Sequence, residues 1–451
     1  MAVSIDTRPA TGDRDREAPL TLGEAPARTL GFLDQFSLWG NLGISLTLPV
    51  LAPFLMPAGT SLAATVTAVL VGAVIGSFLL ALTAVPGAAT GAPAMVVLRG
   101  VFGARLSVLP TAFNVIQCVG WAVVEILVIA QAAQSLTSPS LRWVFILLAG
   151  CAATALALFP LSFIKRMRRY MVVVVLVASA YLFVSTVRHG VGPWSAGDWS
   201  NFWPGVDLVV GLAISWAPLA ADYSRHSRSR RAAFGGAFAG YTAGATVYLL
   251  LGVFALVHMS DKFGDVTGAL LHAVPLAAVA LAVLAVDEVD EAFANVYSTA
   301  MSTQNVAPRL DRRVLAAGIG LTATTVALLV DLRTYQTFLY LIGAVFVPLS
   351  AVLVVTFFAR GRTVWDTSES SPPRPALLLP WVLGFAVYQL IYPTAISPWW
   401  VRRWTSLQSA LHFTPRPWMS ASLLSFAVAA VVTCAMVPML RRRSALRTDS
   451  H

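Results

Sequence analysis

The stretch that decides the fold is "GLAISWAPLAADYSR", residues 211–225, an apolar run that contains a proline, Pro218. A proline inside a helix removes one backbone hydrogen bond and clashes with the preceding turn. A second apolar run is interrupted in a similar way, because "WGNLGISL", residues 39–46, carries Asn41 between two glycines. Both stretches predict helices that break in the interior of a larger helical array.

The composition is that of a polytopic membrane protein. Of the 451 residues, 57% are hydrophobic and only 12% are charged, whereas soluble domains carry about 25% charged residues. The formal net charge is +10, but the basic residues form short clusters between apolar runs, which indicates membrane topology and argues against nucleic-acid binding. Residues 1–30 are polar and mixed in charge, and we expect a disordered cytoplasmic tail there.

A membrane-spanning helix needs about 20 predominantly apolar residues, and twelve segments of the chain meet this requirement. The predicted spans are 32–56, 61–85, 107–134, 141–161, 169–188, 205–223, 233–258, 269–301, 314–331, 334–358, 376–395 and 420–440. The expected fold class is therefore all-α, with twelve transmembrane helices.

The basic residues favour one side of the membrane. If the N-terminus is cytoplasmic, the two tails and the even-numbered loops carry 24 of the 31 Lys and Arg residues. The largest clusters are "KRMRR" at 165–169 and "RHSRSRR" at 225–231. Because cytoplasmic loops carry an excess of Lys and Arg, this bias predicts that both termini are cytoplasmic.

The two interrupted spans are the first and the sixth. Interrupted helices at matching positions of two halves are typical of inverted-repeat transporters, in which they line the substrate site. We therefore predict repeats at about 32–188 and 205–358 within a core of residues 31–358, then a linker and spans 11 and 12 at 359–440, and a basic tail at 441–451. For either helix alone, an ordinary proline kink is the alternative.

Polar residues in the third span share one helical face. Asn114, Gln117, Trp121 and Glu125 recur at spacings of three and four, which places them on one stripe. An indole and hydrogen-bonding groups on one stripe suit a planar heterocycle, whereas the alternative is hydrogen bonding between helices. Beside the break in the sixth span, Ser215 and Trp216 offer a similar pair of hydroxyl and aromatic groups.

The eighth span carries a cluster of acids within "AVDEVDEAFANVYST", residues 285–299. The four carboxylates are Asp287, Glu288, Asp290 and Glu291. Each intramembrane carboxylate costs about 2.5–3.5 kcal/mol on insertion scales, so we expect these groups to line a polar cavity, together with Asn295. The alternative is that the span ends near Ala285 and the acids lie in an exposed loop.

Catalytic motifs are absent from the sequence. It contains no HExxH, GxSxG or Walker loop and no paired His/Cys motif. We therefore predict a protein that is not an enzyme and has no cofactor.

Several motifs resemble the nucleobase:cation symporter-1 family, whose members import cytosine, purines, hydantoins, allantoin and related compounds. The motifs are "FSLWGNLGISL" (36–46), "GAPAMVVLRGVFG" (91–103), "QCVGW" (117–121) and "SWAPLAADYSR" (215–225). The acidic "DEVDEAFANVYST" (287–299) is similar to the CytX-like branch of hydroxymethylpyrimidine or cytosine permeases.

This resemblance implies a LeuT-like fold of two inverted five-helix repeats plus two C-terminal helices, with the substrate between spans 1, 3, 6 and 8. It implies that Trp121 and Trp216 stack on the heterocycle. Gln117 and Ser215 would form hydrogen bonds with its edge. It also implies a monomer in the plasma membrane of a prokaryote, in contact with lipid.

The same resemblance implies a coupling cation between spans 1 and 8. Backbone carbonyls near Gly43 and Leu46 would bind sodium. In the eighth span, Asp290 and Glu291 stand where sodium-coupled members have Thr, Ser or Asn, and Asp287 replaces a small residue. These three acids are candidate cation-coupling residues, and the coupling ion is sodium or a proton.

The expected function is import of a nucleobase-like heterocycle by alternating access. A carboxylate accepts a hydrogen bond from the exocyclic amine of a 4-aminopyrimidine, so cytosine or hydroxymethylpyrimidine suits the site better than uracil or hydantoin. Glu291 or Asp287 would bind the amine, with Glu125 as a further substrate-binding residue. Asn41, Asn114, Glu288 and Asn295 are secondary candidates. The alternative is transport of an organic cation or an amino acid on the same fold.

Overall fold

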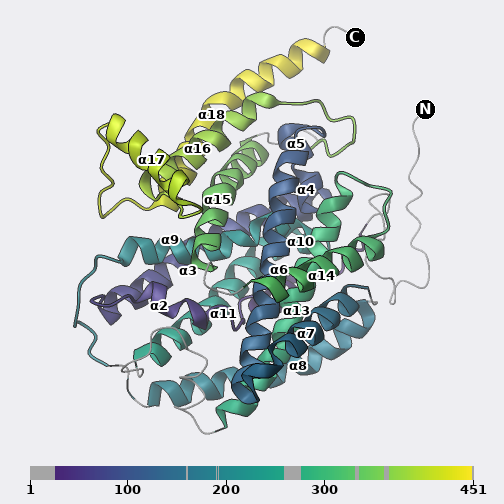
Figure 1. The fold of residues 1–451 in the computed structure, drawn as a ribbon. Helices are drawn as coiled ribbons and strands as arrows, with labels where there is room; N and C mark the ends of the chain where they lie inside the picture. Colours follow the sequence, from purple (N-terminus) through teal and green to yellow (C-terminus); the bar gives the residue numbers. More distant parts are fainter. Residues whose placement is uncertain are drawn as a thin grey trace.

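The computed structural model describes residues 26–158, 161–188, 190, 192–257, 276–330, 335–359 and 365–448. Most of the predicted N-terminal tail, the start of the predicted eighth span and residues 449–451 lie outside the described residues. Within the described residues the structure is helical (Figure 1). The helices are α1 (Phe32–Asn41), α2 (Ala52–Leu55), α3 (Leu62–Thr90), α4 (Ala94–Val97), α5 (Arg99–Phe102), α6 (Val108–Leu136), α7 (Arg142–Leu158), α8 (Leu161–Arg188), α9 (Phe202–Ser215), α10 (Ala220–Ser224), α11 (Arg230–Val257), α13 (Ala277–Gln304), α14 (Arg312–Leu329), α15 (Tyr335–Ala359), α16 (Leu378–Ile391), α17 (Pro398–Ala410) and α18 (Ala421–Thr448).

The first predicted span is broken. Helix α1 ends at Asn41, and helical geometry returns only in the short 3₁₀ turn η1 (Pro49–Leu51) and in α2. Gly43 lies in the break and packs tightly on α11, because a Cβ atom there would be 2.8 Å from the backbone nitrogen of Ala245. Pro49 begins η1, a first position where the missing N–H of a proline is tolerated.

The sixth predicted span is broken too. Helix α9 ends at Ser215, the 3₁₀ turn η3 spans Ala217–Leu219, and α10 follows. The break surrounds Pro218, as the sequence predicts. Gly211 lies within regular helix, where it approaches the backbone of α15 at Gly343.

Two groups of helices pack separately and meet along the breaks. In one group, α1 packs on α11, α11 on α3, and α3 on both α9 and α10. In the other, α6 packs on α13, and α7, α8 and α14 surround this pair. If each of spans 1–5 is replaced by the span five positions later, and the reverse, these contacts map onto one another. The contact of α3 (span 2) with α9 (span 6) becomes that of α11 (span 7) with α1 (span 1), and both occur. In the same way, α6 with α14 (spans 3 and 9) becomes α13 with α7 (spans 8 and 4). This is the contact pattern expected of two five-span repeats, whose inverted orientation and bounds stay a prediction.

The structure shows fewer clear membrane-spanning helices than the twelve that the sequence predicts. Among the described residues, six helices are long and apolar enough to cross a membrane: Leu62–Thr90, Val108–Leu136, Phe202–Ser224, Arg230–Val257, Arg312–Leu329 and Tyr335–Ala359. Four other apolar helices are shorter, the first span is divided by its break, and α13 contains four acids. Twelve spans therefore stay a prediction.

Helix α13 continues without interruption through the acidic cluster, and all four acids are buried. The alternative of an exposed loop after Ala285 is wrong, because the helix extends to Gln304. Helices α16 and α18 pack on α15 outside the two groups, and Figure 1 shows α17 at the periphery, far from α7 and α8.

Candidate functional site

A small cavity lies where the two broken helices meet α6 and α13, with room for about one water molecule. Its walls come from elements far apart in the sequence. The lining residues are Leu42, Thr47, Leu48, Trp121, Glu125, Leu212, Ser215, Trp216, Tyr241, Glu291 and Asn295. The breaks thus leave a small enclosed space inside the bundle.

Two tryptophans form part of the cavity wall. Trp121 is held by edge contacts with Tyr335 and Phe338 of α15, with ring centroids 5.8 and 5.7 Å apart. Trp216 meets Trp39 of α1 edge-on at 6.4 Å. Because their neighbours contact them edge-on, the indoles have preset orientations, which favours stacking on a planar ligand.

The polar groups of the cavity are rich in unused acceptors. Asn295 donates from Nδ2 to Glu125 Oε1 at 2.8 Å. Within the described part of the chain, no hydrogen-bond partner is present for Glu125 Oε2, Glu291 Oε1 or the donor Trp121 Nε1. Gln117 Oε1 also lacks a partner there, but Gln117 is not part of the cavity lining. Buried polar atoms are paired in the great majority of cases, so a cluster of unpaired ones marks a place where a ligand supplies the partners.

Gln117 and Ser215 are joined to each other across the two groups of helices. Gln117 donates from Nε2 to the Ser215 carbonyl at 2.8 Å and to Asn114 Oδ1 at 3.0 Å. Asn114 in turn donates to Ser302 Oγ at 2.8 Å. Ser215 donates its hydroxyl to the Leu212 carbonyl of its own helix. Asn114 therefore acts between helices, as in the alternative interpretation of this stripe. Gln117 keeps one unpaired acceptor behind the cavity lining.

The four acids of α13 are placed differently. Glu291 lines the cavity, whereas Asp287 and Asp290 are buried outside its lining. Glu288 binds the break of the first span through Ser45 and Leu46, at 2.8 and 2.7 Å. At 100° per residue, the four side chains point within about half a turn of the helix. Their spacing in the sequence therefore does not show which acid faces which neighbour.

The candidate cation-coupling residues lie at the break of the first span and on α13. Gly43 packs on α11, and Leu46 donates its backbone N–H to Glu288 Oε2. The secondary candidate Asn41 is the last residue of α1. In the described ranges, no group of three or more His, Cys, Asp or Glu side chains is arranged to hold a metal ion. The coupling role of Asp287, Asp290 and Glu291 stays a prediction.

Sequence reasoning missed the part of the wall that comes from the break itself and from α11. Leu42, Thr47 and Leu48 lie within the break, and Tyr241 reaches the cavity from α11. The glycines in "GNLG" indicated the break. The sequence does not show, however, whether an apolar side chain near the break points into the cavity or away from it.

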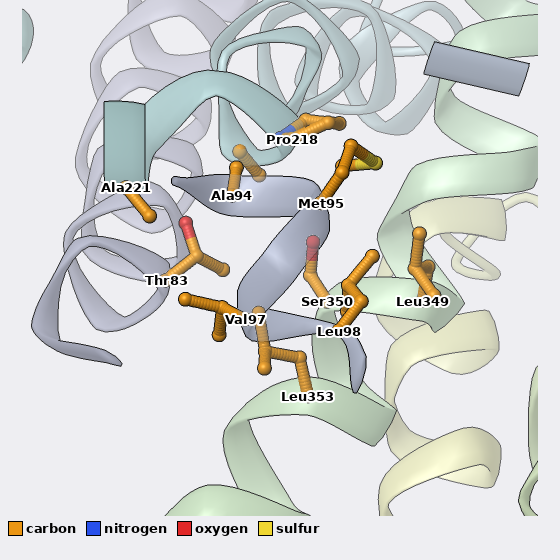
Figure 2. A pocket seen from close by; sticks show the side chains of 11 residues that line it. Thr83, Ala94, Met95, Val97, Leu98, Pro218, Ala221, Leu349, Ser350 and Leu353 are labelled. Atoms are coloured by element: carbon orange, nitrogen blue, oxygen red, sulfur yellow. The ribbon is translucent and has the colours of Figure 1, made fainter. Parts of the chain in front are cut away.

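A second cavity lies on the other side of the sixth-span break. It is mostly apolar and is lined by α3, α4, η3, α10 and α15. Figure 2 shows Met95 close to Pro218, with Ser350 and Leu349 of α15 facing the same space. Ser350 donates its hydroxyl to its own helix, at the Phe346 carbonyl, so this cavity offers few groups for a polar ligand.

Two broken helices that meet at a buried polar cavity in a helical membrane protein are typical of secondary transporters. Residues 23–368 match the family of permeases for cytosine/purines, uracil, thiamine and allantoin. The chain belongs to this family. A curated relative, the protein YxlA of Bacillus subtilis (strain 168), is by name a putative purine-cytosine permease; it is 22% identical over 350 residues, covering 72% of this chain and 75% of the relative.

Solved structures share the fold at low sequence identity. Mhp1, a nucleobase-cation-symport-1 family transporter, in a closed conformation with bromovinylhydantoin bound, has a TM-score of 0.72 at 16% identity and covers 94% of both chains. Inward-facing Mhp1 has a TM-score of 0.70 at 15% identity, with 95% and 94% covered. A Na⁺-coupled sialic acid symporter has a TM-score of 0.62 at 11% identity, with 93% and 92% covered. These structures establish the fold, which serves chemically different substrates.

Proposed function

We propose that the protein is a cation-coupled importer of a 4-aminopyrimidine, cytosine or hydroxymethylpyrimidine, working by alternating access. The family and the fold support a transporter of nucleobase-like compounds. The observation that carries the substrate class is the pair of unpaired acceptors in the cavity, at Glu125 and Glu291.

The chemistry of the ligand follows from these acceptors. A 4-aminopyrimidine donates through its exocyclic amine, and a bond from an N–H to a carboxylate is stronger than one between neutral groups. Glu291 and Glu125 would accept from this amine, and Trp121 Nε1 would donate to the exocyclic carbonyl oxygen of cytosine or to a ring nitrogen. Trp121 and Trp216 would contact the faces of the ring. Uracil has no exocyclic amine, so it would satisfy fewer acceptors.

Coupling requires a cation that enters with the substrate. The Na⁺-coupled symporter of the same fold supports sodium, and the buried acids of α13 support a proton. We propose that Asp287, Asp290 and Glu291 provide the charge that this cation balances. The protein would lie in the plasma membrane of a prokaryote. Both termini would be in the cytoplasm, as the Lys and Arg distribution indicates.

A binding panel on purified protein tests this function. Cytosine and hydroxymethylpyrimidine are titrated against the protein at two pH values, each with and without sodium, beside uracil, hydantoin, a polyamine and a basic amino acid. We expect binding of the two aminopyrimidines and much weaker binding of uracil and hydantoin. Binding of the polyamine or amino acid without the aminopyrimidines would instead support the organic-cation alternative and refute the proposal.

A further inference from the structure

The break in the first span exposes backbone groups that have no helical partner. Helix α1 ends at Asn41, and the Leu46 N–H donates to Glu288 Oε2 at 2.7 Å. Ser45 donates its hydroxyl to the other carboxylate oxygen at 2.8 Å. The Thr47 N–H donates to Ser45 Oγ at 3.1 Å. One buried carboxylate thus organises three consecutive residues of the unwound segment.

This contact joins the two groups of helices. Helix α1 packs on α11, whereas α13 packs on α6 and α7. Glu288 therefore connects α1 to a helix of the other group. The connection lies beside the cavity, since Thr47 and Leu48 follow directly and form part of its wall.

The sixth span has a counterpart of this contact. Gln117 of α6 donates to the Ser215 carbonyl, the last residue of α9 before the break. Helices α6 and α13 pack against each other, so both broken helices are bound at their breaks by side chains of the same helix pair. Exchange of the two halves of the core turns one contact into the other: the contact between spans 8 and 1 becomes the contact between spans 3 and 6.

We propose that Glu288 is a positioning residue that holds the unwound segment Ser45–Thr47, and through it the Thr47–Leu48 wall of the substrate cavity. It acts on the substrate only through this segment, because Glu288 itself is not part of the cavity lining. The role rests on the hydrogen bonds and not on the negative charge. A glutamine can reproduce them, with its oxygen accepting from Leu46 and its amide donating to Ser45 Oγ. The substrate part of this inference rests on the proposed function.

Hydrogen exchange of the ligand-free protein tests the anchor directly. In Glu288→Ala the buried Leu46 N–H loses its acceptor, so we expect the amides of residues 45–47 to exchange at least about tenfold faster. We expect Glu288→Gln to exchange like the wild type and Ser45→Ala to fall between. Cytosine affinity should follow the same order, with a loss of about tenfold in Glu288→Ala.

A matched control removes a buried carboxylate with a similar role elsewhere. Asp207 of α9 accepts from the backbone N–H groups of Ala421 and Ser422 at the start of α18, at 2.8 and 2.9 Å. We expect Asp207→Ala to speed exchange at the start of α18 and to leave residues 45–47 and cytosine affinity unchanged.

Three outcomes would overturn the anchor. They are unchanged exchange at residues 45–47 in Glu288→Ala, a Glu288→Gln variant as impaired as Glu288→Ala, and a loss of affinity without faster exchange. If Glu288→Ala does not fold, unchanged exchange in Ser45→Ala refutes the proposal. If the wild-type protein binds no aminopyrimidine, the proposed function fails, but the exchange measurement still decides whether Glu288 anchors the break.

Discussion

At the scale of the residue, the four acids of α13 show how neighbours on one helix acquire different surroundings. Glu291 opens onto the cavity, Glu288 binds the break of the first span, and Asp287 and Asp290 are buried outside the lining. Sequence reasoning treated Asp287 and Glu291 as equivalent candidates for the amine. The cavity geometry supports Glu291, with Asp287 left for coupling.

The first prediction separates these two acids. Glu291→Gln removes a charged acceptor, and hydrogen bonds to charged groups contribute about 1.5–3 kcal/mol, so cytosine binding should weaken by at least about tenfold and uptake should stop. Asp287→Asn should stop uptake while binding of cytosine persists. Calorimetry on purified protein and radiolabelled uptake into vesicles measure the two effects. Full uptake by both variants would contradict the assignment.

The second prediction concerns the indole of Trp216. Stacking of a base on an aromatic ring contributes about 1–3 kcal/mol by alanine substitution. We expect Trp216→Ala to lose this amount of binding free energy for cytosine, whereas Trp216→Phe should retain most of it. Trp199 is 54% exposed and lies before α9, so Trp199→Ala is the matched control. Equal affinities for Trp216→Ala and wild type would exclude stacking at this position.

At the scale of the element, the breaks depend on close contact between α1 and α11. Gly43 and Gly244 allow the two backbones to approach, because a Cβ atom on either glycine would lie within 3.0 Å of backbone atoms of the other element. The sequence shows these glycines, but they are needed because a helix far away in the chain packs against each of them. Packing therefore accounts for Gly43 without a bound cation.

The third prediction follows from this contact. Gly43→Ala should separate α1 from α11 and lower the melting temperature of the purified protein, because backbone atoms cannot move aside as a flexible side chain would. A Cβ atom on Gly318 of α14 would meet no atom of the described residues within 4 Å, so Gly318→Ala should be neutral or stabilising by up to about 1 kcal/mol. Similar melting temperatures for both variants would refute the packing argument.

At the scale of the whole molecule, the orientation in the membrane rests on charge. The Lys and Arg bias predicts cytoplasmic termini. Helix α17 has no buried residue, and Trp399, Arg402 and Arg403 lie on it, a composition typical of a helix at a membrane interface. The predicted topology places this helix on the outer side.

The fourth prediction tests that orientation with reporter fusions. Green fluorescent protein fused after the last residue should fluoresce, since it folds in the cytoplasm. Alkaline phosphatase fused after Phe413, just beyond α17, should be active, since it requires export. Active phosphatase at the C-terminus with inactive phosphatase after Phe413 would reverse the topology.

The sequence by itself determined the helical membrane class, the two broken spans and the identity of the polar residues near them. These features are local, because apolar runs, Pro218 and the glycines around Asn41 act within a few residues of themselves. Tertiary structure alone decided which groups meet. Glu288 faces Leu46 and Asn295 faces Glu125 because the helix pair α6–α13 packs beside both breaks, and no periodicity within one helix encodes the partner that another helix presents.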